Sequence, residues 1–340
     1  MKDNKINKLR ICLPLLGLAL VASDAQASEI TLNFHSGLAQ SRPEAEHIEE
    51  FARLVEEKSA GELKIDVYHA GALGLKEADI LRTLQRGMVD MALLYGEYYT
   101  RDAPALSAVY AQGAITEPEQ HLDILPVIKE LYDDGFAQWD IHTVGGVVAP
   151  VFDVGLHCKS PVNTLEDLQD KKVRVWSRHL VETFDELGIA AQVIPQNDMY
   201  MALQTGVVDC AYYLSTVAKT ISLQEVTEYE AYLHPWAAAP WIFGISEQAL
   251  GRLNENQRQS LEEAGQEVWE ITRELAVDPE REAEARAERE ELGITVLEPF
   301  STEDVDTFVT AAWNNWQSLA ENAGEDGLRY YETVTEALSE

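Results

Sequence analysis

A pattern of nine residues that occurs twice constrains the fold of this 340-residue chain more than any other feature. Residues 84–95 read LQRGMVDMALLY and residues 203–214 read LQTGVVDCAYYL, so Leu-Gln-x-Gly-x-Val-Asp-x-Ala recurs after 119 residues. In each copy an amphipathic helical pattern ends at a glycine, where a left-handed residue commonly closes a helix, and an apolar strand follows. This order is typical of a βαβ unit. The sequence therefore predicts one α/β unit built twice.

The residues at the end of each copy predict where a ligand would bind. In open α/β sheets, ligands bind outside the carboxyl ends of the strands. Leu94 and Tyr95 end the first copy, and Tyr212 and Tyr213 stand near the end of the second. Two similar halves around a cleft indicate a clamp-like binding protein. The alternative is that the pattern is only a common joint between a helix and a strand.

The first 27 residues have the composition of a secretory signal peptide. Four basic residues precede the apolar run 11–22, and Ala25-Gln26-Ala27 offers a cleavage site. The run is too short to span a bilayer comfortably, and no later stretch approaches the roughly 20 apolar residues that a transmembrane helix needs. We therefore expect an exported, periplasmic protein that is cleaved near Ala27.

Charge and cysteine content narrow the class of protein further. The formal charge is −33, and removal of residues 1–27, which carry a net +2, leaves −35. Such an excess of carboxylates excludes nucleic acid as a natural partner. Cys158 and Cys210 remain after cleavage. A chain of this length can be stabilised by its core alone, so two free thiols and one disulfide bond both fit the sequence.

Common signatures of enzymes and cofactor sites are absent. The sequence contains no G-x-G-x-x-G, G-x-x-x-x-G-K-[ST], H-E-x-x-H or G-x-S-x-G. Its eight histidines lack the short spacings of metal ligands. We therefore predict no cofactor, no metal and no catalytic activity, although a secreted enzyme that uses the same cleft stays an alternative.

Three longer segments predict how the two halves are connected. The β-like run 143–156 and the aromatic segment 229–243 are long enough to cross from one half to the other. Residues 254–291 form an almost unbroken helical pattern, with Pro279 expected to kink the helix.

Several stretches resemble a known family. Residues 61–94, GELKIDVYHAGALGLKEADILRTLQRGMVDMALL, resemble the N-terminal lobe of the solute-binding proteins of TRAP transporters (tripartite ATP-independent periplasmic transporters, DctP-type subunit). Residues 163–175, NTLEDLQDKKVRV, and residues 186–209, ELGIAAQVIPQNDMYMALQTGVVD, are similar to the second lobe of that family. The resemblance implies an α/β clamp of two lobes, like other periplasmic binding proteins, with a long helix spanning both lobes.

The resemblance also implies the domain limits and the function. Lobe I is expected at 28–150 and about 238–279, lobe II at 151–237 and about 280–325, and a C-terminal helix at 326–340. The implied protein is a monomer that captures a small organic acid and delivers it to a TRAP membrane permease driven by an ion gradient. A binding protein of an ATP-driven importer, or a chemoreceptor, would share the clamp but not the permease.

One arginine is the expected anchor for the ligand. The most constant binding residue of the family is the arginine of its K-x-R-V strand, which corresponds to Arg174 here. A guanidinium group matches a carboxylate with two parallel hydrogen bonds and keeps its charge when water is removed. A second arginine that many members carry about 20 residues earlier is absent from Phe152–His157. Tyr213 replaces a common asparagine, and Trp236 stands where members often have a histidine.

The aromatic residues around these positions favour a flat or apolar acid. Trp176 follows Arg174 by two residues and so lies on the same face if the strand continues that far. Rings suit an aromatic or cyclic monocarboxylate better than a polyhydroxylated acid. The alternative is that such rings pack the hinge, which we favour for Trp241 and Phe243. The predicted ligand-binding residues are Arg174, Trp176, Tyr213, Trp236, Phe152, Tyr95, His35, Tyr212 and Asn197.

Overall fold

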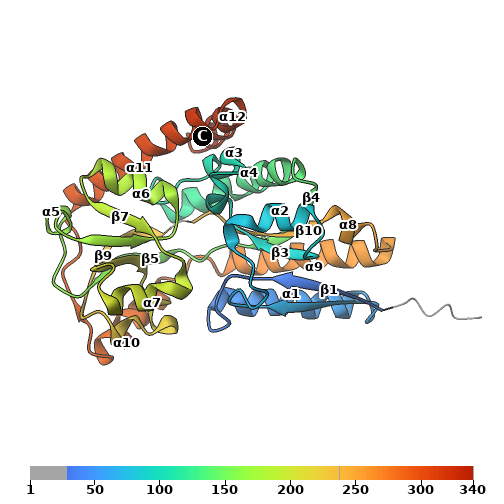
Figure 1. Cartoon of the computed structure of the whole chain (residues 1–340), viewed down its shortest axis with the longest axis horizontal. Helices are drawn as coiled ribbons and strands as arrows, with labels where there is room; N and C mark the ends of the chain where they lie inside the picture. Colours follow the sequence, from blue (N-terminus) through green and yellow to red (C-terminus); the bar gives the residue numbers. More distant parts are fainter. Residues whose placement is uncertain (1–28, 237, 340) are drawn as a thin grey trace, which may run out of the picture.

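The computed structural model of the chain, described here for residues 29–236 and 238–339, has two lobes, each built on one mixed sheet with helices around it (Figure 1). This is the predicted α/β clamp, and the predicted signal peptide lies outside the described residues. In lobe I the sheet order is β2 (Leu63–Tyr68), β1 (Ile30–His35), β3 (Met91–Leu94), β10 (Trp241–Ser246), β4 (Ile141–Val147). In lobe II it is β11 (Thr295–Val296), β9 (Tyr229–Trp236), β5 (Phe152–Cys158), β8 (Cys210–Leu214), β6 (Lys172–Val175), β7 (Ala190–Val193).

The repeated pattern corresponds to a repeated unit, as predicted. In lobe I the parallel strands lie in the order β2-β1-β3, and in lobe II the parallel strands lie in the order β7-β6-β8. Each third strand begins within the last two positions of the pattern, at Met91 and at Cys210. Gly87 and Gly206 have φ of 63° and 76°, a left-handed conformation that side chains other than glycine rarely adopt. The two copies therefore form equivalent helix-to-strand joints.

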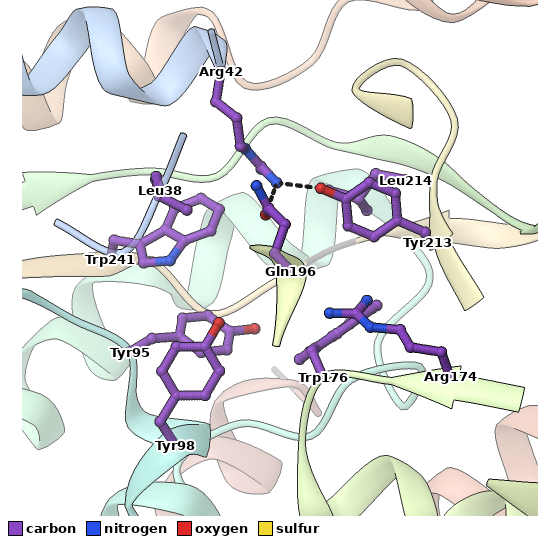
Figure 2. A pocket seen from close by; sticks show the side chains of 10 residues that line it. All are labelled: Leu38, Arg42, Tyr95, Tyr98, Arg174, Trp176, Gln196, Tyr213, Leu214 and Trp241. Carbon is purple, nitrogen blue, oxygen red and sulfur yellow. Dashed lines mark hydrogen bonds between the residues drawn. The ribbon is translucent and has the colours of Figure 1, made fainter. Parts of the chain in front are cut away.

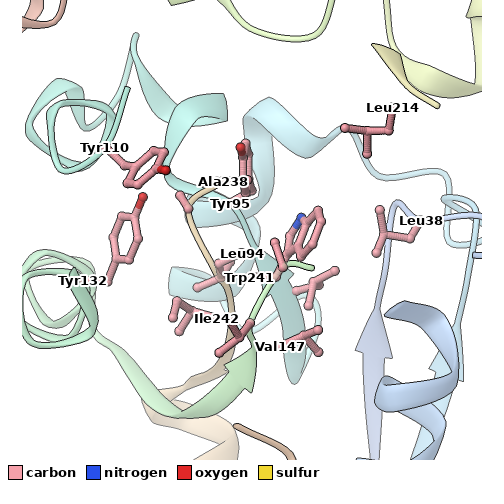
Figure 3. Packing of buried hydrophobic residues seen from close by; sticks show 14 of the residues in the cluster. Leu38, Leu94, Tyr95, Tyr110, Tyr132, Val147, Leu214, Ala238, Trp241 and Ile242 are labelled. Atoms are coloured by element: carbon pink, nitrogen blue, oxygen red, sulfur yellow. The ribbon is translucent and has the colours of Figure 1, made fainter. Parts of the chain in front are cut away.

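Two neighbouring segments cross between the lobes. The run predicted at 143–156 divides into β4 in lobe I and β5 in lobe II, and the aromatic segment divides into β9 and β10. The crossings are adjacent, since Trp241 pairs with Val147 on one side and Phe152 pairs with Trp236 on the other. Around the crossing, Trp241 and Val147 belong to the same buried core as Leu94 (Figure 3).

The helices cover both sheets. In lobe I, α1 (Pro43–Lys58) packs against α9 (Glu255–Glu274), and in lobe II, α6 (Arg178–Glu186) packs against β7. One helix, α11 (Thr302–Asn322), contacts both α6 and α3 (Pro104–Ala108), so it bridges the lobes. No helix in the described parts of the chain has the length and apolarity to cross a membrane. The other helices are α2 (Ile80–Gln85), α4 (Pro118–Ala137), α5 (Leu165–Leu168), α7 (Gln196–Thr205), α8 (Glu247–Leu250), α10 (Pro279–Glu291) and α12 (Glu325–Ala337).

The prediction of one kinked helix over 254–291 is wrong, because the structure has two separate helices there. Residues 275–278 separate α9 from α10. The Asp278 carboxylate accepts hydrogen bonds from the backbone N–H groups of Glu280 and Arg281, and Pro279 occupies the first turn of α10. A capping aspartate followed by proline is a strong helix start, so α10 begins anew there. The residue limits predicted for the lobes remain predictions.

A disulfide bond joins Cys158 and Cys210, which settles the alternative that the sequence left open. Cys158 ends β5 and Cys210 begins β8, and the two residues stand opposite each other in the antiparallel pair, with Cα atoms 4.2 Å apart. The bond therefore locks the register of two central strands of lobe II.

We predict that loss of this disulfide lowers the free energy of unfolding by about 2–4 kcal/mol, because the bond closes a loop of 52 residues in the unfolded chain. Urea denaturation of the protein with and without reductant measures the difference. A Cys158→Ser, Cys210→Ser double variant should resemble the reduced protein and should not respond to reductant. Equal stability of the oxidised and reduced proteins would contradict the prediction.

Candidate functional site

A small cavity lies between the lobes, and each lobe contributes five side chains to its wall (Figure 2). From lobe I and the joint after β1 come Leu38, Arg42, Tyr95, Tyr98 and Trp241. From lobe II come Arg174, Trp176, Gln196, Tyr213 and Leu214. The repeated pattern accounts for part of this arrangement, since Tyr95 follows β3 and Leu214 ends β8 at equivalent places.

Arg174 is a buried cation without a counter-ion. It lies on β6, with only 1% of its surface exposed. Its Nε donates to the carbonyl oxygen of Ile194 at 2.8 Å, while Nη1 has no hydrogen-bond partner among the described residues. Burial lowers the pKa of Arg174 to about 10, and no carboxylate of the described chain acts against that effect. The group stays charged at neutral pH, with its guanidinium 5.9 Å from the ring of Trp176 and 5.5 Å from that of Tyr213.

Arg42 is a second buried arginine, which the sequence analysis missed. It stands before the first turn of α1, with 3% of its surface exposed. Its Nη1 donates to Gln196 Oε1 at 3.1 Å and to the Tyr213 hydroxyl at 3.0 Å, so it bonds across to lobe II (Figure 2). Its Nε donates to Glu44 Oε2 at 2.8 Å, and Nη2 donates to Glu44 Oε1. Arg42 therefore joins the two lobes while Glu44 neutralises it.

The pKa of Arg42 reflects this neutralisation. Burial lowers the pKa, but the Glu44 carboxylate and Tyr213 act more strongly and raise it well above its ordinary value. The sequence contained one sign of this role. A cation just before a helix is opposed by the helix dipole, so Arg42 is an unfavourable residue at this position, whereas Pro43 and Glu44 favour the start of α1.

Aromatic rings form much of the remaining wall. Tyr95 contacts Tyr98 at 5.1 Å and Trp241 at 5.7 Å between ring centroids, and Trp176 stacks on Tyr212 at 5.0 Å. Trp241 packs at the crossing, as we favoured, and it also lines the cavity.

Four of the residues predicted to bind ligand line the cavity, namely Arg174, Trp176, Tyr213 and Tyr95. Tyr212 points to the opposite face of β8 because side chains alternate along a strand. Its hydroxyl bonds His234 Nε2 at 2.5 Å in the core. Whether the four residues contact a ligand remains a prediction.

Three other predicted residues, His35, Phe152 and Asn197, do not line the cavity. His35 is buried and pairs with Glu77 at 2.8 Å, and Phe152 lies in the core on β5. Asn197 Nδ2 donates to the Ala70 carbonyl at 3.5 Å, which is a contact between lobes. The side chain of Trp236 lies outside the described residues. The sequence analysis missed four further lining residues because no short-range pattern marks them: Leu38, Tyr98, Gln196 and Leu214.

A buried carboxylate lies beside the cavity. Glu97, in the short helix Gly96–Tyr99, has 2% of its surface exposed and accepts a hydrogen bond from the Tyr95 hydroxyl at 3.4 Å. Burial raises the pKa of Glu97 to about 7, although hydrogen bonds with Ser177 and Trp176 of lobe II offset part of the effect. No group of three or more His, Cys, Asp or Glu side chains within the described ranges is arranged to hold a metal ion.

The fold and the site define a class of protein, a two-lobed α/β binding protein with a cavity between its lobes. The family model described as bacterial extracellular solute-binding protein, family 7 (DctP) matches residues 34–322. Because this match covers most of the chain, the chain belongs to that family, as the resemblance implied.

Individual relatives agree with this assignment. A solute-binding protein of Chromohalobacter salexigens is 26% identical over 288 residues, which cover 81% of this chain and 83% of the relative. The C4-dicarboxylate-binding periplasmic protein DctP of Rhodobacter capsulatus is 28% identical over 205 residues, which cover 57% of this chain and 58% of that protein. Both relatives are named as binding proteins for a solute.

Solved structures share the fold. An extracytoplasmic solute receptor of Bordetella pertussis that binds pyroglutamic acid superposes with a TM-score of 0.81 at 18% identity, covering 92% of this chain and all of the receptor. A TRAP periplasmic solute-binding protein from Rhodoferax ferrireducens with bound malonate gives a TM-score of 0.78 at 21% identity, covering 91% of this chain and 98% of that protein.

We predict that Glu97 makes the protein less stable as the pH rises. Its folded pKa of about 7 lies above the ordinary value of 4.5, so the folded state binds more protons and loses stability between pH 4.5 and 7. Glu97→Gln removes the titration. The difference in unfolding free energy, variant minus wild type, should therefore increase by about 2–3 kcal/mol from pH 5 to pH 8.

Denaturant titrations at a series of pH values measure this difference. Subtracting the wild-type curve removes the effect of the buried histidines, which titrate in both proteins. Glu290→Gln, an exposed change of the same charge, is the control for the loss of one negative charge as such. A flat difference curve for Glu97→Gln would show that Glu97 is not a neutral buried acid.

Proposed function

We propose that this chain is the periplasmic receptor of a TRAP transporter, which captures a small organic acid between its lobes and delivers it to a membrane permease driven by an ion gradient. The uncompensated guanidinium of Arg174 supports this proposal most strongly. A buried charge without a partner costs several kcal/mol, and a ligand carboxylate would remove that cost. The relatives support an acid as ligand, since solved members hold malonate, glucuronate, galacturonate and pyroglutamate.

Capture and release require the lobes to separate. Both lobes form the cavity wall, and Arg42 and Asn197 bond across the gap only when the lobes are together. An acid bound to Arg174 on lobe II would meet the rings of Tyr95 and Trp241 on lobe I, so it would favour the closed state over the open one. A permease that recognises the closed state would therefore recognise the loaded receptor.

Uptake measurements test the choice of permease. Reconstituted with the TRAP permease of its source organism in vesicles, the receptor should support uptake of its acid when an ion gradient is present and no ATP is added. Uptake that required ATP and ignored the gradient would favour an ATP-driven importer.

We predict that Arg174→Ala weakens binding of the ligand acid by about 2–5 kcal/mol, because the carboxylate would then be buried without a partner. This corresponds to a loss of roughly 30-fold to several-thousand-fold in affinity. Arg174→Lys should recover only part of the loss, since an ammonium group keeps the charge but not the planar fork. Calorimetric titration with the acid that gives the largest thermal shift in a library measures these affinities.

Arg178→Ala is the matched control. Arg178 lies four residues from Arg174, is exposed, and pairs with Glu182 at 2.8 Å. Its removal should change affinity little. Unchanged affinity in an Arg174→Ala protein whose circular dichroism shows a native fold would disprove the proposed anchor.

A further inference from the structure

The cavity has two arginines in its wall but only one unneutralised charge. Arg42 and Arg174 are the only charged side chains among the ten described residues that line it. The Glu44 carboxylate accepts hydrogen bonds from both Nε and Nη2 of Arg42. The third nitrogen of Arg42 bonds Gln196 and Tyr213. The wall therefore carries a net charge of +1, located on Arg174.

We propose that the Arg42–Glu44 pair sets the charge of the ligand, so that this cavity accepts a monocarboxylate with an apolar or aromatic body and rejects dicarboxylates. This inference rests on the proposed function and specifies its substrate class. Without Glu44, the two guanidinium groups would present two positive charges to the same space, since Arg42 bonds the hydroxyl of Tyr213 and Arg174 lies over its ring. Two such cations would suit a dianion. With Glu44 in place, they suit a monoanion.

The position of Glu44 makes the neutralisation permanent. Glu44 is in the first turn of α1, where the helix dipole favours an anion, and it is fully buried. A second ligand carboxylate would have to displace Glu44 from Arg42 and leave it buried without a partner, which is costly. The rest of the wall cannot replace Arg42 as a partner, because it consists mainly of rings and leucines, with Gln196 as the one amide.

Two other carboxylates lie near the cavity without lining it. Neither of them adds positive charge that would favour a dianionic ligand. Glu97 lies behind Tyr95, and burial raises its pKa to about 7. Glu77 pairs with His35 at 2.8 Å. Each of them, where ionised, adds negative charge and so further disfavours a second anionic group on the ligand.

Glu44→Gln tests the inference. The glutamine is similar in size and its amide oxygen can still accept from Arg42, but the compensating charge is lost. Affinities are measured by calorimetry at pH 7.5 for matched acids that differ by one carboxylate: benzoate and phthalate, cyclohexanecarboxylate and cyclohexane-1,2-dicarboxylate, and pentanoate and glutarate. The wild type should prefer the monoacid of a pair by about tenfold or more. In Glu44→Gln the ratio of affinities should shift toward the diacid by about tenfold or more. The reason is that the second carboxylate of the diacid, which has no partner in the wild type, can then pair with Arg42.

Glu46→Gln is the control, because Glu46 is exposed in the same turn of α1 and its loss changes the net charge equally. The ratio of affinities should stay unchanged in this variant. An equal shift in both variants would overturn the inference, since it would show a long-range effect of charge alone. The wild-type preference tests the inference even if Glu44→Gln fails to fold.

The outcomes separate this inference from the proposed function. A wild-type protein that binds diacids as tightly as monoacids, and loses them in Arg174→Ala, would overturn the charge rule and leave an acid receptor standing. A wild-type protein that binds no acid of either kind would overturn both.

Discussion

The uncompensated charge of Arg174 is the constraint on which the rest of the site depends. A guanidinium with 1% of its surface exposed and no carboxylate beside it destabilises the closed state until an anion arrives. The bonds of Arg42 to Gln196 and Tyr213 act in the opposite direction, because they form between lobes and favour closure. The balance of these two effects would keep the empty receptor ready to open and let a bound carboxylate shift it to the closed state.

The duplicated unit explains why the two arginines lie so close. The order β2-β1-β3 in lobe I is matched by β7-β6-β8 in lobe II, so β1 and β6 are equivalent central strands. Arg174 lies near the carboxyl end of β6, and Arg42 lies on the joint that follows β1, so both arginines come from the carboxyl-end side of a central strand, although their positions in the two units are not equivalent. They differ in one neighbour. Glu44 follows Arg42 by two residues, whereas Arg174 is followed by Trp176, and this difference makes one arginine a bridge and leaves the other available to a ligand.

The sequence predicted features that depend on short-range patterns. The repeat and its glycines follow from spacing and were correct. Arg174 and Trp176 both line the cavity, although β6 ends at Val175, one residue before Trp176. Features that depend on long-range register could not be read in this way: the disulfide requires β5 to lie beside β8, and the role of Arg42 requires lobe II to close on it. The sequence predicted a kink at Pro279 where the structure has a break between two helices. The helical pattern continues through this point, but the Asp278 side chain caps a new helix there.

The strong negative charge of the chain makes closure itself part of binding. At physiological salt the Debye length is about 8 Å, so exposed carboxylates that are farther than this from an approaching acid anion repel it only weakly. At 4 Å, two opposite charges attract by about 1 kcal/mol in bulk water but by about 4 kcal/mol at the effective dielectric constant of a partly buried site. Arg174 can therefore outweigh an acidic surface only where water is excluded. Because Tyr95 and Trp241 of the opposite lobe line the other side of the cavity, strong binding of an anion and closure of the lobes would be one energetic event under the proposed function.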